Sequence, residues 1–188
     1  MTLWLFIWRL NPPHIWHIGI IKRALKENKK VLLLLWTPFL YNKNNPLDFN
    51  TRKKILEKIF RDENIKILEI KDKKTDLEWI ENIKNILEKH FNNFNKINFY
   101  GWDFENDSAF KVFKKYAPWK KCPWCEENFQ NCTFNYILNS RINSFIEYNN
   151  KKYKISATNL REALYDKNYK LAKEFCIQES FEEIKNYF

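Results

Sequence analysis

Glycine is nearly missing from this sequence. Only Gly19 and Gly101 occur among 188 residues, where average usage would give about thirteen glycines. Tryptophan, in contrast, occurs eight times. Glycine lets a backbone turn with positive φ or approach a ligand closely. In this sequence, most positions of that kind must therefore be occupied by other residue types.

Long apolar runs and targeting signals are missing as well. No stretch of eighteen apolar residues occurs, so the sequence predicts no transmembrane helix. The apolar run at residues 3–7 is too short for the core of a signal peptide, and Arg9 soon follows it. We therefore expect a cytoplasmic protein without a membrane partner. A hydrophobic content of 45% predicts one domain, residues 1–188, with a sizeable core.

Arginine is scarce, yet the net charge is +10 because lysine is abundant. Such a charge is compatible with a polyanionic partner. The lysines are spread along the chain, however, and the other abundant residue types (Asn, Ile, Phe and Tyr) are also encoded by A/T-rich codons. A nucleic-acid surface more often shows a concentrated basic patch. We favour the compositional interpretation, so nucleic acid is not an expected partner.

The four cysteines give no disulfide framework, because a cytosolic chain of this size seldom has one. Cys122, Cys125 and Cys132 lie close together in a stretch, residues 117–135, that breaks the pattern around it and resembles an insertion. These three residues could hold a structural zinc ion, with Cys176 or His90 as the fourth ligand. Reduced surface thiols are the alternative that we favour, since zinc sites usually show two paired ligand sets.

Strand-like and helix-like segments alternate along most of the chain. Apolar runs at residues 3–7, 31–35, 65–70 and 97–100 are typical of buried strands, and amphipathic segments separate them. This alternation predicts an α/β fold with a parallel sheet. Residues 145–148 and 151–155 flank Asn149 and Asn150, which suit a tight hairpin. The region 156–188 is predicted to be helical.

The first strand leads into a turn that is suited to anions. Residues 9–17 read R-L-N-P-P-H-I-W-H, and a helix-like run, residues 18–25, follows. The two prolines exclude helix at the turn itself. The start of the following helix presents unpaired backbone N–H groups and partial positive charge, which favour phosphate. His14 and His17 would add ring donors on the first helical turn. This pattern predicts a phosphate site after the first strand.

A second motif lies far downstream, where residues 155–161 read I-S-A-T-N-L-R. Together the two segments resemble the H-x-G-H nucleotidyltransferase superfamily, which includes nicotinamide and nicotinate mononucleotide adenylyltransferases. The family patterns are G-x-F-x-P-x-H-x-G-H and I-S-x-T-x-[IV]-R. The resemblance implies a Rossmann-like α/β domain, with helices on both faces of a parallel sheet, a small helical C-terminal part and an adenylyltransferase activity.

The resemblance also assigns roles to residues. His14, His17 and Arg161 would be catalytic, and Arg161 would hold the outer phosphates of ATP. The other residues implied at the ATP site are Arg9, Asn11, Trp16, Ser156 and Thr158. Each has a structural alternative: His14 could merely cap the helix, and Ser156 and Thr158 are good N-caps in any case.

Residues 45–52 resemble an N-P-F-T-x-x-E-R segment of archaeal-type nicotinamide mononucleotide adenylyltransferases, and Arg52 matches the last arginine. Arg52, Thr37 and Trp102 are the candidates for binding the acceptor, although core packing is the more usual role of a tryptophan. The expected partners are ATP and a pyridine mononucleotide, with Mg²⁺ bridging the phosphates. Nicotinamide or nicotinate specificity stays open, as does assembly into a homo-oligomer.

Two other functions remain. One is that of the related pantetheine-phosphate adenylyltransferases, and the other is that of a catalytically inactive relative that binds nucleotide or RNA. Tryptophan bears on the choice, because Trp8 and Trp16 stand where the family has glycine, and Trp36 where relatives often have it. An indole at position 16 could fill the adenosine pocket. Either these tryptophans are real and the site has diverged, or they are UGA codons that the source lineage reads as glycine.

Overall fold

The structure is a computed structural model that describes residues 2–27, 30–61, 64–91, 96–102, 107–116, 133–139 and 143–188. Contacts within the chain divide it into two compact units, which are described separately. The sheet unit consists of Met1–Trp8, Asn28–Phe39 and Asn64–Ser140. The turn unit consists of Arg9–Glu27, Leu40–Glu63 and Arg141–Phe188.

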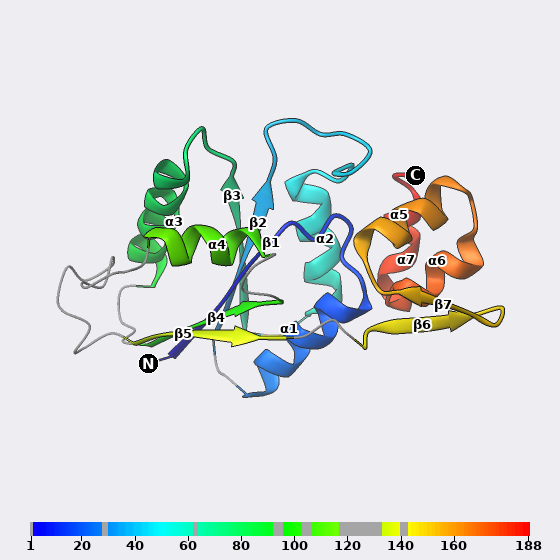
Figure 1. The fold of residues 1–188 in the computed structure, drawn as a ribbon, viewed down its shortest axis with the longest axis horizontal. Coiled ribbons are helices and arrows are strands. Elements are labelled where there is room, and N and C mark those ends of the chain that lie inside the picture. Colours follow the sequence, from blue (N-terminus) through cyan, green and yellow to red (C-terminus); the bar gives the residue numbers. More distant parts are fainter. Residues whose placement is uncertain are drawn as a thin grey trace. The chain divides into compact units, whose positions relative to one another are not determined.

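The sheet unit is built on five parallel strands in the order β3-β2-β1-β4-β5 (Figure 1). The strands are β1 (Thr2–Trp8), β2 (Val31–Thr37), β3 (Ile65–Lys71), β4 (Lys96–Gly101) and β5 (Thr133–Leu138). The four strands that sequence patterns predict are therefore confirmed, and β5 is an additional one. An α/β, Rossmann-like fold with a parallel sheet and C-terminal helices is confirmed.

Apolar side chains explain the packing of this sheet. Leu3, Leu5 and Ile7 alternate along β1 and join one core cluster with residues of α3 (Asp76–His90) and α4 (Ser108–Tyr116). A two-residue period places such side chains on one face of a strand. Both helices begin at a capping side chain: Thr75 Oγ1 accepts the N–H of Glu78 at 3.2 Å, and Asp107 Oδ1 accepts that of Ala109 at 3.1 Å.

Gly101 is one of the two glycines, and its position is tightly packed. A Cβ atom added at Gly101 would lie 2.5 Å from Cζ of Phe110. Phe110 is fully buried in the sheet core. At Gly19, in contrast, an added Cβ would meet nothing within 4 Å. Gly101 is therefore required by close packing and Gly19 is not.

The turn unit carries most of the helices. It contains α1 (Ile15–Glu27), α2 (Phe49–Ile59), the hairpin strands β6 (Phe145–Tyr148) and β7 (Lys151–Lys154), and then α5 (Ala157–Tyr165), α6 (Tyr169–Phe175) and α7 (Gln178–Lys185). Asn149 and Asn150 have φ angles of 50° and 60°, as the predicted tight turn requires. The C-terminal region is not one helix, because the extended backbone of Cys176 separates α6 from α7.

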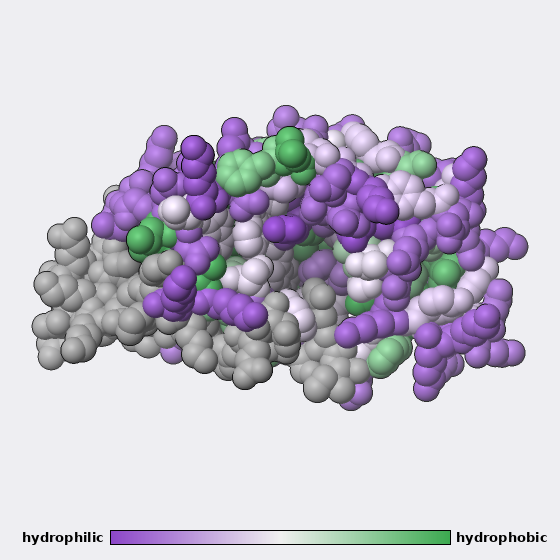
Figure 2. Space-filling view, turned by 45° about the horizontal axis from the view of Figure 1, so that its top comes forward, coloured by the Kyte–Doolittle hydropathy of each residue, from purple (hydrophilic) through white to green (hydrophobic). Residues whose placement is uncertain are grey.

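A second apolar cluster stabilises the turn unit. It gathers buried side chains of α2, α5, α6 and α7, including Ile55, Leu160, Phe175 and Ile184. Hydrophilic side chains cover much of the described surface seen in Figure 2. Three exposed large hydrophobic residues are consecutive in the chain, Phe39, Leu40 and Tyr41. Among the described residues, no helix has both the length and the apolar character needed to cross a membrane.

Candidate phosphate-binding site

The turn after β1 brings the two histidines together. His14 directly precedes α1, and His17 lies in its first turn. Their rings are stacked, with centroids 3.7 Å apart and an interplanar angle of 29°. The side chains are 1% and 6% exposed. The pair is thus held at the start of a helix, where the backbone favours an anion.

Asn11 shapes the turn through its side-chain amide. The Nδ2 atom donates to the carbonyl of Leu47 at 2.9 Å, and Oδ1 accepts the N–H of Leu47, also at 2.9 Å. The peptide bond between Asn11 and Pro12 is cis, and Leu10 has a φ of 46°. Leu47 lies within residues 45–52, but it contributes only its backbone groups, so its side-chain type does not predict this contact.

Arg161 connects the second motif to this turn. Its Nη1 donates to the carbonyl of Asn11 at 2.7 Å, and its Nη2 donates to Oγ1 of Thr158 at 3.2 Å. Burial lowers the pKa of Arg161, while Tyr165 and Glu162 act in the opposite direction. A guanidinium has five N–H donors, so these two bonds leave capacity for a phosphate. Two segments 150 residues apart therefore meet at one place.

Ser156 caps α5, as its type and position predict. Its Oγ accepts the N–H of Asn159 at 3.1 Å. The hydroxyl of Ser156 can still donate its own hydrogen, and so can that of Thr158. The start of α5 thus presents hydroxyl donors together with the guanidinium of Arg161.

Trp16 and Arg9 occupy different environments within the turn unit. The indole of Trp16 is partly buried against the apolar cluster of the C-terminal helices. Its ring centroid lies 5.6 Å from that of His17 and 6.5 Å from that of His14. Arg9 is exposed, and its carbonyl accepts a hydrogen bond from Arg52. A bulky indole is therefore a direct neighbour of both histidines.

Arg52 is completely buried, at 0% exposure. Its Nε donates to the carbonyl of Asp48 at 3.1 Å, and its Nη1 donates to the carbonyl of Arg9 at 2.5 Å. Asp48 is also the N-cap of α2, where its Oδ1 accepts the N–H of Thr51 at 2.7 Å. One of these bonds of Arg52 therefore reaches the backbone of the turn, at Arg9, and the other reaches the start of α2, at Asp48.

Thr37 and Trp102 belong to the sheet unit. Thr37 ends β2, is buried, and donates its hydroxyl to the carbonyl of Leu35 at 3.4 Å. Trp102 follows β4, and its backbone N–H donates to Oδ2 of Asp107 at 3.3 Å. Trp36, on β2, donates its indole N–H to Oδ1 of Asp72 at 2.8 Å. The acceptor-binding roles of Thr37 and Trp102 stay predictions.

The zinc hypothesis gains no support. Cys122, Cys125 and Cys132 lie outside the described residues. Within the described ranges, no group of three or more His, Cys, Asp or Glu side chains could hold a metal ion. Burial raises the pKa of Cys176 to about 12, so its thiol stays protonated at neutral pH. That environment disfavours the thiolate that zinc needs.

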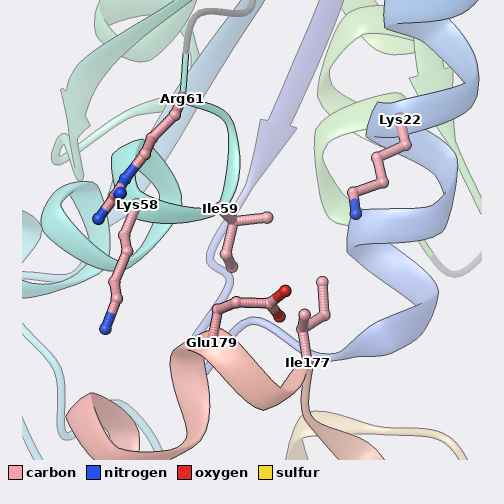
Figure 3. A pocket seen from close by; sticks show the side chains of 6 residues that line it. All are labelled: Lys22, Lys58, Ile59, Arg61, Ile177 and Glu179. Atoms are coloured by element: carbon pink, nitrogen blue, oxygen red, sulfur yellow. The ribbon is translucent and has the colours of Figure 1, made fainter.

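A cavity of about 400 Å³ opens elsewhere in the turn unit (Figure 3). Lys22 of α1, Lys58 and Ile59 of α2, Arg61, and Ile177 and Glu179 at the start of α7 line it. Figure 3 shows the carboxylate of Glu179 between the apolar side chains of Ile59 and Ile177, on the side that faces Lys22. None of these residues belongs to the predicted site.

Comparison with known proteins shows likeness at the level of structure. Neither the scan against known family patterns nor the search of curated proteins finds a match. Among solved structures, the bifunctional NMN adenylyltransferase/ADP ribose pyrophosphatase of Francisella tularensis superposes with a TM-score of 0.70 at 19% identity, over 99% of this chain and 49% of that one. The same protein has been solved with AMP and a manganese ion.

Two further structures show the same fold. NadR in complex with NAD and AMP-PNP gives a TM-score of 0.62 at 18% identity, over 86% of this chain and 42% of that one. A protein assigned as a nicotinate-nucleotide adenylyltransferase of Vibrio parahaemolyticus gives 0.50 at 17% identity, over 97% of both chains. The chain spans about half the length of the Francisella protein. These likenesses establish a fold shared with adenylyltransferases of pyridine mononucleotides.

Proposed function

We propose that this protein transfers AMP from ATP to nicotinamide mononucleotide, forming NAD and releasing pyrophosphate. The observation that carries the proposal is the hydrogen bond from Arg161 to the carbonyl of Asn11. It joins the second motif to the turn that holds the stacked histidines. A triphosphate needs several positioned donors at one place, and this junction supplies donors from two parts of the chain.

The reaction needs no covalent intermediate. A phosphate oxygen of the mononucleotide forms a bond to the α-phosphorus of ATP, while the bond between that phosphorus and the bridging oxygen breaks. The negative charge that grows on the leaving pyrophosphate needs stabilisation. His17 would donate to the α-phosphate and His14 to a neighbouring oxygen. Arg161 would hold the outer phosphates, since its forked guanidinium matches their geometry.

A divalent metal would enter with ATP. Mg²⁺ keeps several water ligands and is commonly bound through substrate phosphates, where it would neutralise charge on the triphosphate. The manganese ion in the structure of the Francisella protein with AMP accords with this role. The residues of the turn unit would then orient the phosphates.

Nicotinamide rather than nicotinate mononucleotide is favoured by residues 45–52, which resemble the corresponding segment of archaeal-type enzymes. The N-P-P-H opening and residues 177–184 look more like the bacterial nicotinate enzyme. The test is product analysis by mass spectrometry, with ATP, Mg²⁺ and each of three acceptors: nicotinamide mononucleotide, nicotinate mononucleotide and phosphopantetheine. We expect NAD as the main product. Formation of dephospho-coenzyme A alone, or of no product, would contradict the proposal.

Trp16 favours a second candidate, a nucleotide-binding relative without activity. Its indole lies beside both histidines, where the family has glycine. Binding of ATP, measured by calorimetry, without pyrophosphate release for any acceptor would support this alternative.

A further inference from the structure

Side-chain hydrogen bonds hold the backbone at two positions before the histidines, Arg9 and Asn11. We call these two sets of hydrogen bonds the two ties. Arg52 binds the carbonyl of Arg9, and the amide of Asn11 pairs with both backbone polar groups of Leu47. Both ties lead to adjacent positions, Leu47 and Asp48, at the start of α2. The turn is therefore fixed against one short segment of the chain.

The residue between the two ties has an unfavourable backbone conformation. Leu10 has a φ of 46°, in the left-handed region that is unfavourable for a non-glycine residue. Such a conformation persists when the surrounding structure holds it. The hydrogen bonds of Arg52 and Asn11 lie on either side of Leu10 and supply that constraint.

The burial of Arg52 and its backbone partners favour a positioning role over the predicted contact with the acceptor. Its side chain is 0% exposed, and its Nε and Nη1 donate to backbone carbonyls. Burying a guanidinium is costly unless hydrogen bonds compensate. Here the compensating bonds run to the carbonyls of Arg9 and Asp48, so they hold the turn against the start of α2.

We propose that Arg52 is a positioning residue for the His14–His17 pair. Its guanidinium ties the carbonyl of Arg9 to that of Asp48 and so fixes the turn that places the two rings. The catalytic part of this proposal rests on the proposed function. The positioning part does not, because it concerns the geometry of the histidines alone.

The chain has only three histidines, so their ring signals can be followed individually by NMR on protein with isotope-labelled histidine. His90 lies in the sheet unit and serves as an internal reference. Arg52→Lys keeps the positive charge but loses the guanidinium group that reaches two carbonyls. We expect this variant to shift the signals of His14 and His17 and to leave that of His90 unchanged. The matched control is Arg61→Lys, at an exposed arginine just after α2, which should shift none of them.

Kinetics supply the second readout. With Arg52→Lys we expect kcat to fall by about 10–100-fold, the scale of a misplaced catalytic group, while the KM for each substrate changes by less than about threefold. A residue that contacts the acceptor phosphate would instead raise the KM for the mononucleotide with little change in kcat. That pattern, or unshifted signals of His14 and His17 in folded protein, would overturn the proposal.

Failure of the proposed function can be distinguished from failure of the positioning role of Arg52. Absence of activity in the unaltered protein contradicts the proposed function, whereas the NMR shifts still test the positioning role. If Arg52→Lys does not fold, Arg52→Gln removes the buried charge and repeats both measurements. Should neither variant fold, Arg52 is a residue required for folding and the positioning proposal is wrong.

Discussion

The sheet unit and the turn unit each have an apolar cluster, but side-chain hydrogen bonds play a larger part at the turn before α1. In the sheet unit, a continuous apolar cluster packs β1, β2 and β4 against α3 and α4. The turn unit also has an apolar cluster, but side-chain hydrogen bonds to backbone groups fix the turn that precedes α1. We therefore expect substitutions in the sheet unit mainly to lower stability, and substitutions in the turn mainly to lower activity.

The largest effect on activity is expected from His17→Ala. Removing a preorganised phosphate donor should lower kcat by about 100-fold or more, with pyrophosphate release as the measurement. His90→Ala is the matched control, because it removes a histidine from the sheet unit and should change kcat by less than about twofold. Equal activity of His17→Ala and the unaltered protein would contradict the assigned mechanism.

Trp16→Gly should affect stability and activity in opposite directions. Loss of the indole from the apolar cluster and a glycine in a helix should together lower the free energy of unfolding by about 2–3 kcal/mol. If the indole obstructs the nucleotide, kcat/KM for ATP should rise by about tenfold, which corresponds to 1.4 kcal/mol. Trp16→Phe keeps an aromatic ring and should show a smaller rise.

A fall in activity with Trp16→Gly would instead mean that the indole contributes to the site. Peptide mass spectrometry of the natural protein then determines whether position 16 is tryptophan or glycine. A glycine mass at position 16 would show that the codon is read as glycine, and a tryptophan mass would exclude that reading.

The two glycines form a matched pair for stability. Gly101→Ala would place Cβ 2.5 Å from the ring of buried Phe110, and such overpacking should cost about 1–3 kcal/mol. Gly19→Ala has open space at the added Cβ and should stabilise α1 by about 0.5–1 kcal/mol. Chemical denaturation of both variants tests this contrast, and a loss of stability with Gly19→Ala would contradict it.

The smallest effect concerns Glu183 of α7, whose Oε1 lies 2.5 Å from Nζ of Lys58 on α2. The hydrogen bond from Lys58 lowers the pKa of Glu183. A lowered folded-state pKa stabilises the protein above the ordinary glutamate pKa, about 4.3, and that contribution is lost as the pH falls through the folded value. Because both side chains are partly exposed, solvent screening limits it to about 0.5 kcal/mol.

Thermal unfolding at several pH values measures this effect. Glu183→Gln should be slightly less stable than the unaltered protein at pH 7, and the difference should vanish in strong acid. Glu182→Gln, at a more exposed pair with Lys185, is the control and should show a smaller difference.

Local signals in the sequence were sufficient for much of the fold. The adjacent Asn149 and Asn150 made the β6–β7 hairpin predictable, and both have positive φ in the structure. The side-chain type of Ser156 made the start of α5 predictable. The strand β5 was not predicted, because a stretch rich in proline and cysteine precedes it. The alternation of helix-like and strand-like segments is therefore not recognisable there. The break at Cys176 was also missed, since the apolar spacing of α6 and α7 is compatible with one helix.

The candidate site also has features that local sequence predicts and features that it does not. Spacing alone predicted that His14 and His17 would share the start of a helix, and their rings do stack. Long-range partners could not be predicted from spacing. The burial of Arg52 and the pairing of Asn11 with Leu47 depend on which backbone groups tertiary packing brings close, and backbone groups leave no mark in a side-chain pattern.

The central claim is that the histidine turn and the start of α5 form one triphosphate site. A double-mutant cycle with His17→Ala and Arg161→Ala tests it most directly, with kcat/KM for ATP as the measured quantity. If both residues bind one triphosphate, the two effects should be coupled by at least about 1 kcal/mol, as for residues that act on the same group. Effects that add to within about 0.5 kcal/mol would show that His17 and Arg161 act at two independent sites.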